Sequence, residues 1–293
     1  IRYTLPAAGC LMLLAGCMKW DYGTTEEFSA SGRGLFVTNE GNFQYGNATL
    51  SYYDPKTKRV ENEVFFRANG FKLGDVAQSM TVRDGVGWIV VNNSHVIFAI
   101  DIDTFREVGR ITDLTSPRYI HFLSDTKAYV TDLFSPYITI FDPRTCKITG
   151  PIHTGQTPST GSYNSTEQMA QYDKWVFVNC WSYSNKILVI DSDQDKVVHE
   201  IELRSIQPNS LVVDRNGKLW ALTDGGYAGS EYGPNPVSTA STLRPGASNR
   251  SSSSKRRSIP RSSASTVRAT CSTSSTTASA RCRSRPRTLP SGR

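Results

Sequence analysis

Residues 138–145, Ile-Thr-Ile-Phe-Asp-Pro-Arg-Thr, carry the pattern that decides the fold. Variants of it recur as Leu-Ser-Tyr-Tyr-Asp-Pro-Lys-Thr at 50–57, Ile-Phe-Ala-Ile-Asp-Ile-Asp-Thr at 97–104 and Ile-Leu-Val-Ile-Asp-Ser-Asp at 187–193. The first aspartates of these repeats lie at positions 54, 101, 142 and 191, so the spacings are 47, 41 and 49 residues. A repeat of this length in a strand-rich chain is typical of the four-stranded blade of a β-propeller.

Each repeat ends in a sequence suited to a tight turn. The aspartate of D-P-x-T accepts hydrogen bonds from backbone N–H groups of the turn, and the proline presets φ. Charged segments follow, such as residues 58–64 and 196–201, which is expected of the outermost, solvent-facing strand of a blade.

A second phrase recurs between these turns. It is a β-branched or aromatic run that closes on Asn or Asp, found at residues 34–39, 87–92, 128–132, 175–179 and 219–224. Four of the five are preceded by an approach strand, and no long amphipathic helix is predicted. The order predicts an all-β propeller of four-stranded blades; a sandwich of repeated hairpins is the alternative, although a sandwich needs no constant period.

The charge is unevenly distributed. The chain carries 33 Lys and Arg against 26 Asp and Glu, a net +7, but 12 of the basic residues and none of the acidic ones follow residue 236. Removing those 12 charges from +7 leaves residues 1–236 with −5. A nucleic-acid-binding domain is therefore excluded as the first choice for the part that can fold.

Residues 237–293 differ from the rest in composition. They contain no Phe, Tyr or Trp and consist mostly of Ser, Thr, Arg, Pro and Ala, so they cannot bury a core, and we expect a disordered tail. Translation in a shifted reading frame produces this composition as well, and a frame starting at the third base of the Val237 codon is compatible with a further D-P-A-T turn. The propeller is then expected over 34–236, with about four and a half blades in frame.

The N-terminal residues resemble a processed leader. An apolar run from Leu5 to Cys17 is too short to span a bilayer and ends in Leu-Ala-Gly-Cys, which is similar to the lipobox of bacterial lipoproteins. We therefore expect a signal peptide over 1–16, lipidation of Cys17 and a linker over 17–33, which would anchor the protein in a membrane. A chance Ala-Gly-Cys after a leader is the alternative.

The remaining cysteines and histidines do not suggest a metal site. Cys146 and Cys180 lie in separate strand-like runs and are expected to be buried thiols. The four histidines are scattered singly, so neither a metal nor a resident cofactor is expected.

The repeated phrases resemble a known family. The V-x-N and V-x-V-I-D-x-x-T phrases look like the YVTN-type, YncE-like propellers. The segment Asn-Glu-Gly-Asn-Phe-Gln-Tyr-Gly-Asn at 39–47, the lipobox and Trp-Val-Phe-Val-Asn-Cys-Trp-Ser at 175–182 are similar to DUF5074/YncE-like surface lipoproteins of gut anaerobes. That resemblance implies a seven-bladed propeller at the outer-membrane surface. Within the group, BtuG-type proteins capture cobalamin and pass it to a TonB-dependent transporter. This chain departs from the pattern because its repeats stop in the fifth blade.

Propeller geometry predicts where a ligand would bind. The start of the first strand and the end of the second strand of every blade lie on the same face, and polar and aromatic residues gather at these places. Rings and amides suit a large, flat, amide-bearing ligand such as a corrinoid or, less well, a glycan. The residues expected to bind it are Asn39, Asn42, Phe43, Gln78, Asn92, Asn93, Arg118, Tyr137, Gln168, Asn179, Trp181, Tyr183, Asp224 and Tyr227.

Two alternatives remain open for these residues. Arg118 is the charged residue most expected to contact a ligand, but a salt bridge to a neighbouring blade would explain it equally. An enzyme is disfavoured, because the predicted face has one Glu, two Asp and no clustered His. A protein-interaction scaffold, such as a lid for a transporter, is the competing non-enzymatic function.

Overall fold

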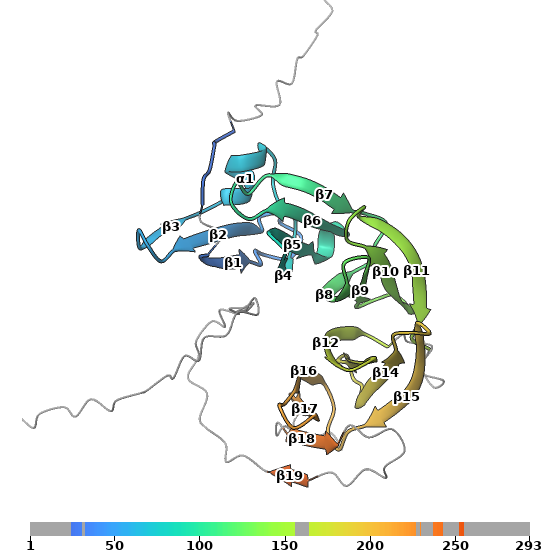
Figure 1. Cartoon of the computed structure of the whole chain (residues 1–293). Helices are drawn as coiled ribbons and strands as arrows, with labels where there is room; N and C mark the ends of the chain where they lie inside the picture. The colour runs from blue at the N-terminus through green and yellow to red at the C-terminus, as the bar shows by residue number, and fades with distance from the viewer. Residues whose placement is uncertain are drawn as a thin grey trace, which may run out of the picture.

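The computed structural model describes residues 25–30, 33–155, 164–226, 229, 237–242 and 252–254. For residues 239–242 and 252–254 it describes only the backbone. Five antiparallel sheets follow one another in an open arc, each turned about a common axis (Figure 1). This arrangement confirms the predicted all-β propeller. The expected leader and Cys17 lie outside the described residues.

The first sheet has three strands and the other four sheets have four each. The first contains β1 (Leu35–Asn39), β2 (Thr49–Asp54) and β3 (Arg59–Glu61), and the second contains β4 (Ala77–Arg83), β5 (Val86–Val91), β6 (Val96–Asp101) and β7 (Glu107–Ile111). The third contains β8 (Pro117–Ser124), β9 (Lys127–Asp132), β10 (Tyr137–Asp142) and β11 (Lys147–His153), and the fourth contains β12 (Thr166–Tyr172), β13 (Trp175–Cys180), β14 (Lys186–Asp191) and β15 (Lys196–Glu202). The fifth contains β16 (Pro208–Val213), β17 (Lys218–Thr223), β18 (Val237–Thr242) and β19 (Ser252–Ser254). Short helices α1 (Val64–Asn69) and η1 (Asn92–Ser94) precede β4 and β6.

The first sheet has one strand fewer than the predicted four. The described residues before β1, 25–30 and 33–34, contain no strand, so β1 takes the place that the second strand holds in the other sheets, and it pairs with β2 as β5 pairs with β6. At the other end of the chain, β18 pairs with β17 and β19 pairs with β18. Residues 237–242 and 252–254, which we expected in the tail, therefore continue the fifth sheet.

The repeated aspartates close the turns between third and fourth strands. Asp101 Oδ1 accepts the backbone N–H of Asp103 at 3.1 Å and that of Thr104 at 2.8 Å. In the equivalent turns, the carboxylates of Asp54, Asp142 and Asp191 each accept a hydrogen bond from the backbone N–H two residues later in the chain, at 2.8, 2.9 and 3.0 Å. This predicted role is confirmed, and it is local: the carboxylate substitutes for a backbone partner that the tight turn cannot supply.

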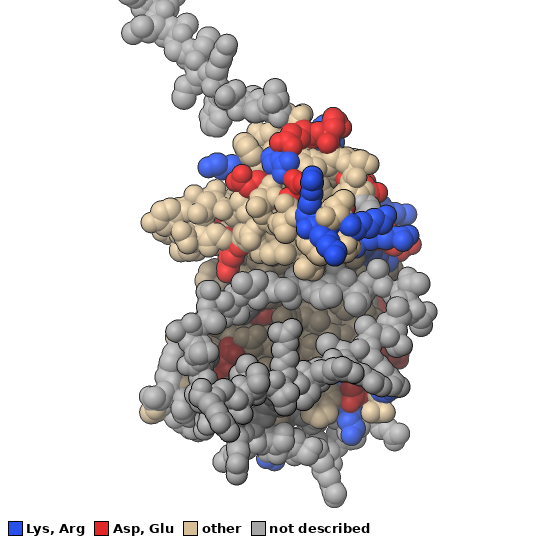
Figure 2. All heavy atoms as spheres, turned by 90° about the vertical axis from the view of Figure 1, so that its left-hand side faces the viewer, with Lys and Arg blue, Asp and Glu red and all other residues tan. Residues whose placement is uncertain are grey.

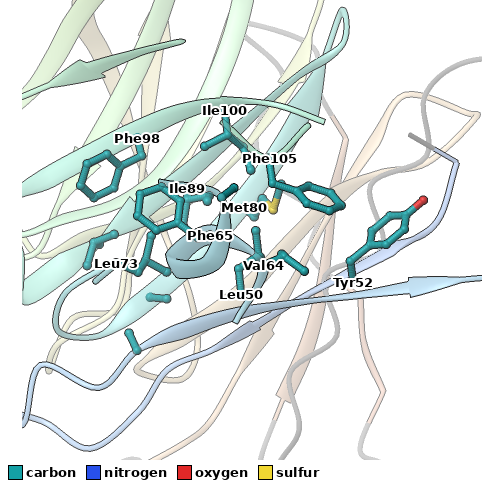
Figure 3. Close-up of a cluster of buried hydrophobic side chains, with 14 of the residues drawn as sticks. Leu50, Tyr52, Val64, Phe65, Leu73, Met80, Ile89, Phe98, Ile100 and Phe105 are labelled. Carbon is teal, nitrogen blue, oxygen red and sulfur yellow. The ribbon is translucent and has the colours of Figure 1, made fainter. Parts of the chain in front are cut away.

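The core lies between consecutive sheets. Between the first two sheets, α1 inserts Val64 and Phe65, which pack with Leu50, Ile89 and other residues labelled in Figure 3. Further clusters fill the next three inter-sheet spaces. One of them encloses Cys180, whose burial raises the pKa of its thiol to about 12.

Charged side chains of both signs lie close together at one end of the arc (Figure 2). Figure 2, which looks into the open side of the arc, shows Lys and Arg beside Asp and Glu at the end that holds α1. Arg67 on α1 pairs with Glu26 at 2.6 Å and with Glu61 at 2.9 Å, which ties the segment before β1 to the first sheet. Within the described part of the chain, no helix has the length and apolar character needed to cross a membrane.

Candidate functional site

The two ends of the sheets differ in what they expose. The end where first strands begin and second strands finish carries the connections 40–48, 92–95, 133–136 and 181–185, and we call it the loop face. Its exposed aromatic side chains come from three different sheets: Phe43 (62% exposed), Tyr45 (75%), Phe134 (64%), Tyr137 (36%) and Tyr183 (70%). The opposite end, the turn face, is closed by the aspartate turns. Tyr172, at the end of β12, is an exposed aromatic side chain on the turn face (44% exposed).

Two of the predicted amides point into the protein and not toward solvent. Asn92 is 7% exposed, and its Nδ2 donates to Ser116 Oγ at 2.8 Å and to the Pro117 carbonyl at 3.0 Å. Asn179 is fully buried, and its Nδ2 donates to the Pro208 carbonyl at 2.5 Å. Each amide thus joins the end of a second strand to the start of the next sheet.

The same junction occurs between the third and fourth sheets with other residues. Asp132 is 3% exposed, and its backbone N–H and carbonyl bond to the Thr166 hydroxyl at 3.0 and 2.9 Å. Its carboxylate also accepts the backbone N–H of Ser116 at 2.7 Å. These three junctions give the Asn or Asp at the ends of β5, β9 and β13 a structural role that sequence periodicity alone does not distinguish from a ligand contact.

Arg118 forms an ion pair with the neighbouring sheet. Its Nε and Nη2 both lie 2.9 Å from Glu167 Oε1, and the two side chains are only 14% and 7% exposed. The pair connects β8 to β12. The salt bridge that the sequence left as an alternative is therefore the observed contact of Arg118.

Trp181 and Asp224, from the fourth and fifth sheets, come together on the loop face. The Trp181 indole Nε1 donates to Asp224 Oδ2 at 3.3 Å, and Asn209 Nδ2 lies 3.0 and 3.2 Å from the two oxygens of the same carboxylate. This contact fixes the indole ring from the neighbouring sheet. Tyr183, in the same connection as Trp181, is exposed.

The remaining predicted residues are distributed around the face. Gln78 is partly buried and donates to the Tyr119 hydroxyl at 3.3 Å, while Gln168 is partly buried on β12. Asn39 donates to the hydroxyls of Thr49 and Ser51 at 2.9 and 3.0 Å. Asn42 is exposed, and Tyr227 lies outside the described residues.

Sequence reasoning missed Asp75, which holds the connection 40–48 in place. Asp75 is 8% exposed, and its Oδ2 accepts the Gln44 backbone N–H at 2.7 Å and Asn93 Nδ2 at 2.5 Å. Its other oxygen has no hydrogen-bond partner within the described structure. The next residue, Val76, has φ of 63°, a strained value for a β-branched residue. The only sequence signal was a Gly-Asp pair just before an approach strand.

A small pocket lies beside this connection, between β2 and α1. It has a volume of 140 Å³ and is lined by Gly46, Asn47, Ala48, Thr49, Leu50, Glu63, Phe65, Phe66, Lys72 and Leu73. A drug-sized ligand needs about 300 Å³ or more. A corrinoid is therefore too large to bind inside this pocket.

The described residues contain no candidate metal centre. Within 25–30, 33–155 and 164–226, no three His, Cys, Asp or Glu side chains lie close enough together to hold a metal ion. The most buried histidine, His121, contacts Gln171 Oε1 at 2.9 Å. Burial lowers the pKa of His121, and the contact with Gln171 opposes that shift.

Fold and loop geometry define a β-propeller protein with one elaborated face. The family described as Domain of unknown function (DUF5074) matches residues 33–267, and the chain belongs to that family. The match extends past residue 236, through β18 and β19. No curated protein sequence matches the chain.

Solved structures show the fold alone. Hydrazine synthase of Kuenenia stuttgartiensis is 14% identical with a TM-score of 0.60, over 80% of this chain and 68% of that one. A catalytically inactive virginiamycin B lyase from Staphylococcus aureus, solved with quinupristin, is 13% identical with a TM-score of 0.53, over 80% and 74%. The Cps50 (Swd1) propeller domain of Myceliophteria thermophila is 9% identical with a TM-score of 0.54, over 75% and 65%. These neighbours include enzymes, at identities that transfer no activity.

Proposed function

We propose that the protein captures a corrinoid on its loop face and does not transform it. The observation that carries the proposal is the set of exposed rings on three separate connections, Phe43 and Tyr45, Phe134, and Tyr183, all on one end of the sheets. Exposed rings on several supports suit stacking against one large, flat ligand. The resemblance to BtuG-type proteins supplies the ligand class.

The amide-bearing residues of the face supply the polar contacts in this proposal. Asn42 and Gln168 have exposed or partly exposed side chains, so they can reach the peripheral amides of a corrinoid. Asn93 is partly exposed and can offer its amide oxygen, since its Nδ2 donates to Asp75. Asn92, Asn179 and Arg118 act differently, since they hold neighbouring sheets at fixed positions. They preorganise the face without touching the ligand.

Location and partner follow from the resemblance. A lipid on Cys17 would hold the protein at the outer-membrane surface, where it would pass its ligand to a TonB-dependent transporter. The lipobox-like sequence that ends at Cys17 and the resemblance to DUF5074/YncE-like surface lipoproteins support this part of the proposal.

Equilibrium titration with cyanocobalamin tests the proposal. We expect sub-micromolar binding, and about a two- to twelvefold loss of affinity for Tyr183→Ala or Phe134→Ala, the range that one aromatic contact contributes. Tyr172→Ala is the matched control, because Tyr172 is an exposed ring at the opposite end of the fourth sheet.

Two results would move the proposal elsewhere. A protein that folds but ignores cyanocobalamin rejects a corrinoid and leaves a glycan or a protein as the partner of the loop face. If Tyr172→Ala weakens binding as much as Tyr183→Ala does, the ligand does not bind at the loop face.

A further inference from the structure

The pocket between β2 and α1 has walls that both belong to the described part of the chain. One wall is the connection 40–48 with the start of β2, and the other is α1 with the segment that follows it. The Ala48 backbone N–H donates to the Gly74 carbonyl at 3.0 Å, which holds the connection against the segment after α1. The pocket is therefore formed where the first sheet meets the connection to the second.

The floor of the pocket is apolar and already packed. Leu50, Phe65 and Leu73 line it, and they are only 0%, 1% and 2% exposed. All three belong to the buried cluster between the first two sheets, in which Figure 3 labels them. A preformed apolar floor of this kind suits a small aliphatic group.

Two side chains of opposite charge line the same pocket. Lys72 and Glu63 are both exposed, and within the described residues neither side chain has a hydrogen-bond or ion-pair partner. Glu63 also has φ of 54°, a strained value for a residue other than glycine. It stands at the start of α1, but its side chain does not cap the helix. The strain therefore serves no local hydrogen bond of the Glu63 side chain.

The remaining polar side chains of the pocket have donors to spare. Asn47 Oδ1 already accepts the backbone N–H of Asn42 at 2.8 Å, which leaves the Nδ2 group of Asn47 as a donor. The Thr49 hydroxyl oxygen accepts Asn39 Nδ2 at 2.9 Å, which leaves its own O–H to donate. With the Lys72 ammonium group, three side chains can donate to a bound carboxylate, and the single carboxylate of the pocket can accept from a bound ammonium group.

We propose that this pocket binds a small aliphatic α-amino acid. The carboxylate of the ligand binds among Lys72, Asn47 and Thr49, and its ammonium group binds Glu63. Its aliphatic side chain lies on the apolar floor. At about 10–15 Å³ for each water-sized group, a volume of 140 Å³ has room for roughly ten non-hydrogen atoms, which L-valine does not exceed.

Isothermal titration of the full chain with L-valine tests the proposal. We expect saturable binding with a Kd below about 1 mM. Isovalerate lacks the ammonium group of L-valine, and isobutylamine lacks its carboxylate, so each should bind at least about tenfold more weakly. Cyanocobalamin is left out of these titrations, so their result does not bear on corrinoid binding at the loop face.

Charge-removing variants assign the two ends of the ligand. Lys72→Met and Glu63→Gln should each weaken L-valine binding by about ten- to a hundredfold, the range of one hydrogen bond to a charged group. Lys72→Met should not change the affinity for isobutylamine, and Glu63→Gln should not change that for isovalerate. The matched control is Lys56→Met, which removes the same charge from an exposed position in the turn between β2 and β3 and should leave binding unchanged.

Three results would overturn the proposal. The first is a folded protein, checked by its circular dichroism spectrum, that shows no saturable binding of L-valine in this range. The second is binding of isovalerate or isobutylamine as tight as that of L-valine, because the two charges would then not select a zwitterion. The third is a loss in Lys56→Met equal to that in Lys72→Met, which would place the ligand outside this pocket.

Discussion

The ion pair between Arg118 and Glu167 gives the sharpest test of how the sheets are held together. Removing the guanidinium with Arg118→Met takes away the positive charge that Arg118 places beside the Glu167 carboxylate, whose side chain is 7% exposed. Breaking one side of a buried pair costs about 3–5 kcal/mol, and we expect the lower end because the Arg118 side chain is 14% exposed. Replacing both residues, as in Arg118→Met with Glu167→Leu, should cost about 1 kcal/mol or less, since no charge remains buried.

Urea unfolding at 25 °C measures both variants. With a slope of about 3 kcal/mol per molar urea, Arg118→Met should lower the midpoint by about 1 M, while the double variant should lie near the unsubstituted protein. Arg59→Met is the control, because Arg59 is exposed on β3, and its effect should stay within about 0.5 kcal/mol.

Two outcomes would refute this reasoning. If Arg118→Met costs no more than Arg59→Met, the pair does not hold the sheets together, and Arg118 is available to a ligand as the sequence first suggested. Glu167→Leu alone completes the comparison. If the double variant loses as much stability as Arg118→Met and Glu167→Leu lose when measured separately and added, the two side chains do not interact in solution.

Four further predictions follow from single residues. Folding lowers the pKa of His121, so the unfolded chain binds the proton more readily than the folded protein does. The free energy of unfolding should therefore fall as the pH drops through about 6.5. Urea midpoints measured from pH 8 to pH 5 check this, and the His121→Gln variant should show a weaker pH dependence. Cys180 is fully buried and should resist alkylation at pH 8 until the protein unfolds. Cys146 is partly buried and its pKa is raised, so it should react slowly in the native state. Peptide mapping after alkylation measures both rates, and equal rates would contradict the difference in burial. Asp75→Ala should speed hydrogen exchange in residues 41–47 by about tenfold, since about 1–2 kcal/mol of hydrogen bonding is lost, and unchanged exchange would reject the clamp. Sequencing the coding DNA should reveal a frame that continues past Val237 with acidic and aromatic residues; an uninterrupted reading of the Arg- and Ser-rich segment would reject the frameshift hypothesis.

Sequence periodicity predicted the parts of the fold that depend on neighbouring residues. The aspartate turns need only a carboxylate two or three residues before the N–H groups it accepts, as at Asp101. The alternation of each strand and the 41–49 residue spacing fixed the blades and their order. The three-stranded first sheet was not predicted, because the sequence pattern was interpreted as four strands in every blade.

The binding face was only partly predictable. Exposed Phe43 and Tyr183 were named correctly as loop-face rings, because their position between second and third strands follows from the blade order. Asn92 and Asn179 carried the same local pattern, yet their amides turn inward to carbonyls of the next sheet. Exposure, which separates the two groups, is not encoded in a strand's own sequence.

What the sequence determined by itself was the blade, since turn capping and strand alternation act within a few residues. Only the tertiary structure decided how blades meet. Arg118 finds Glu167 across 49 residues, and Asp75 finds Gln44 across 31. Partners so far apart become neighbours only after the sheets pack, and the free energy that selects them comes from desolvation between sheets, which no single blade experiences alone.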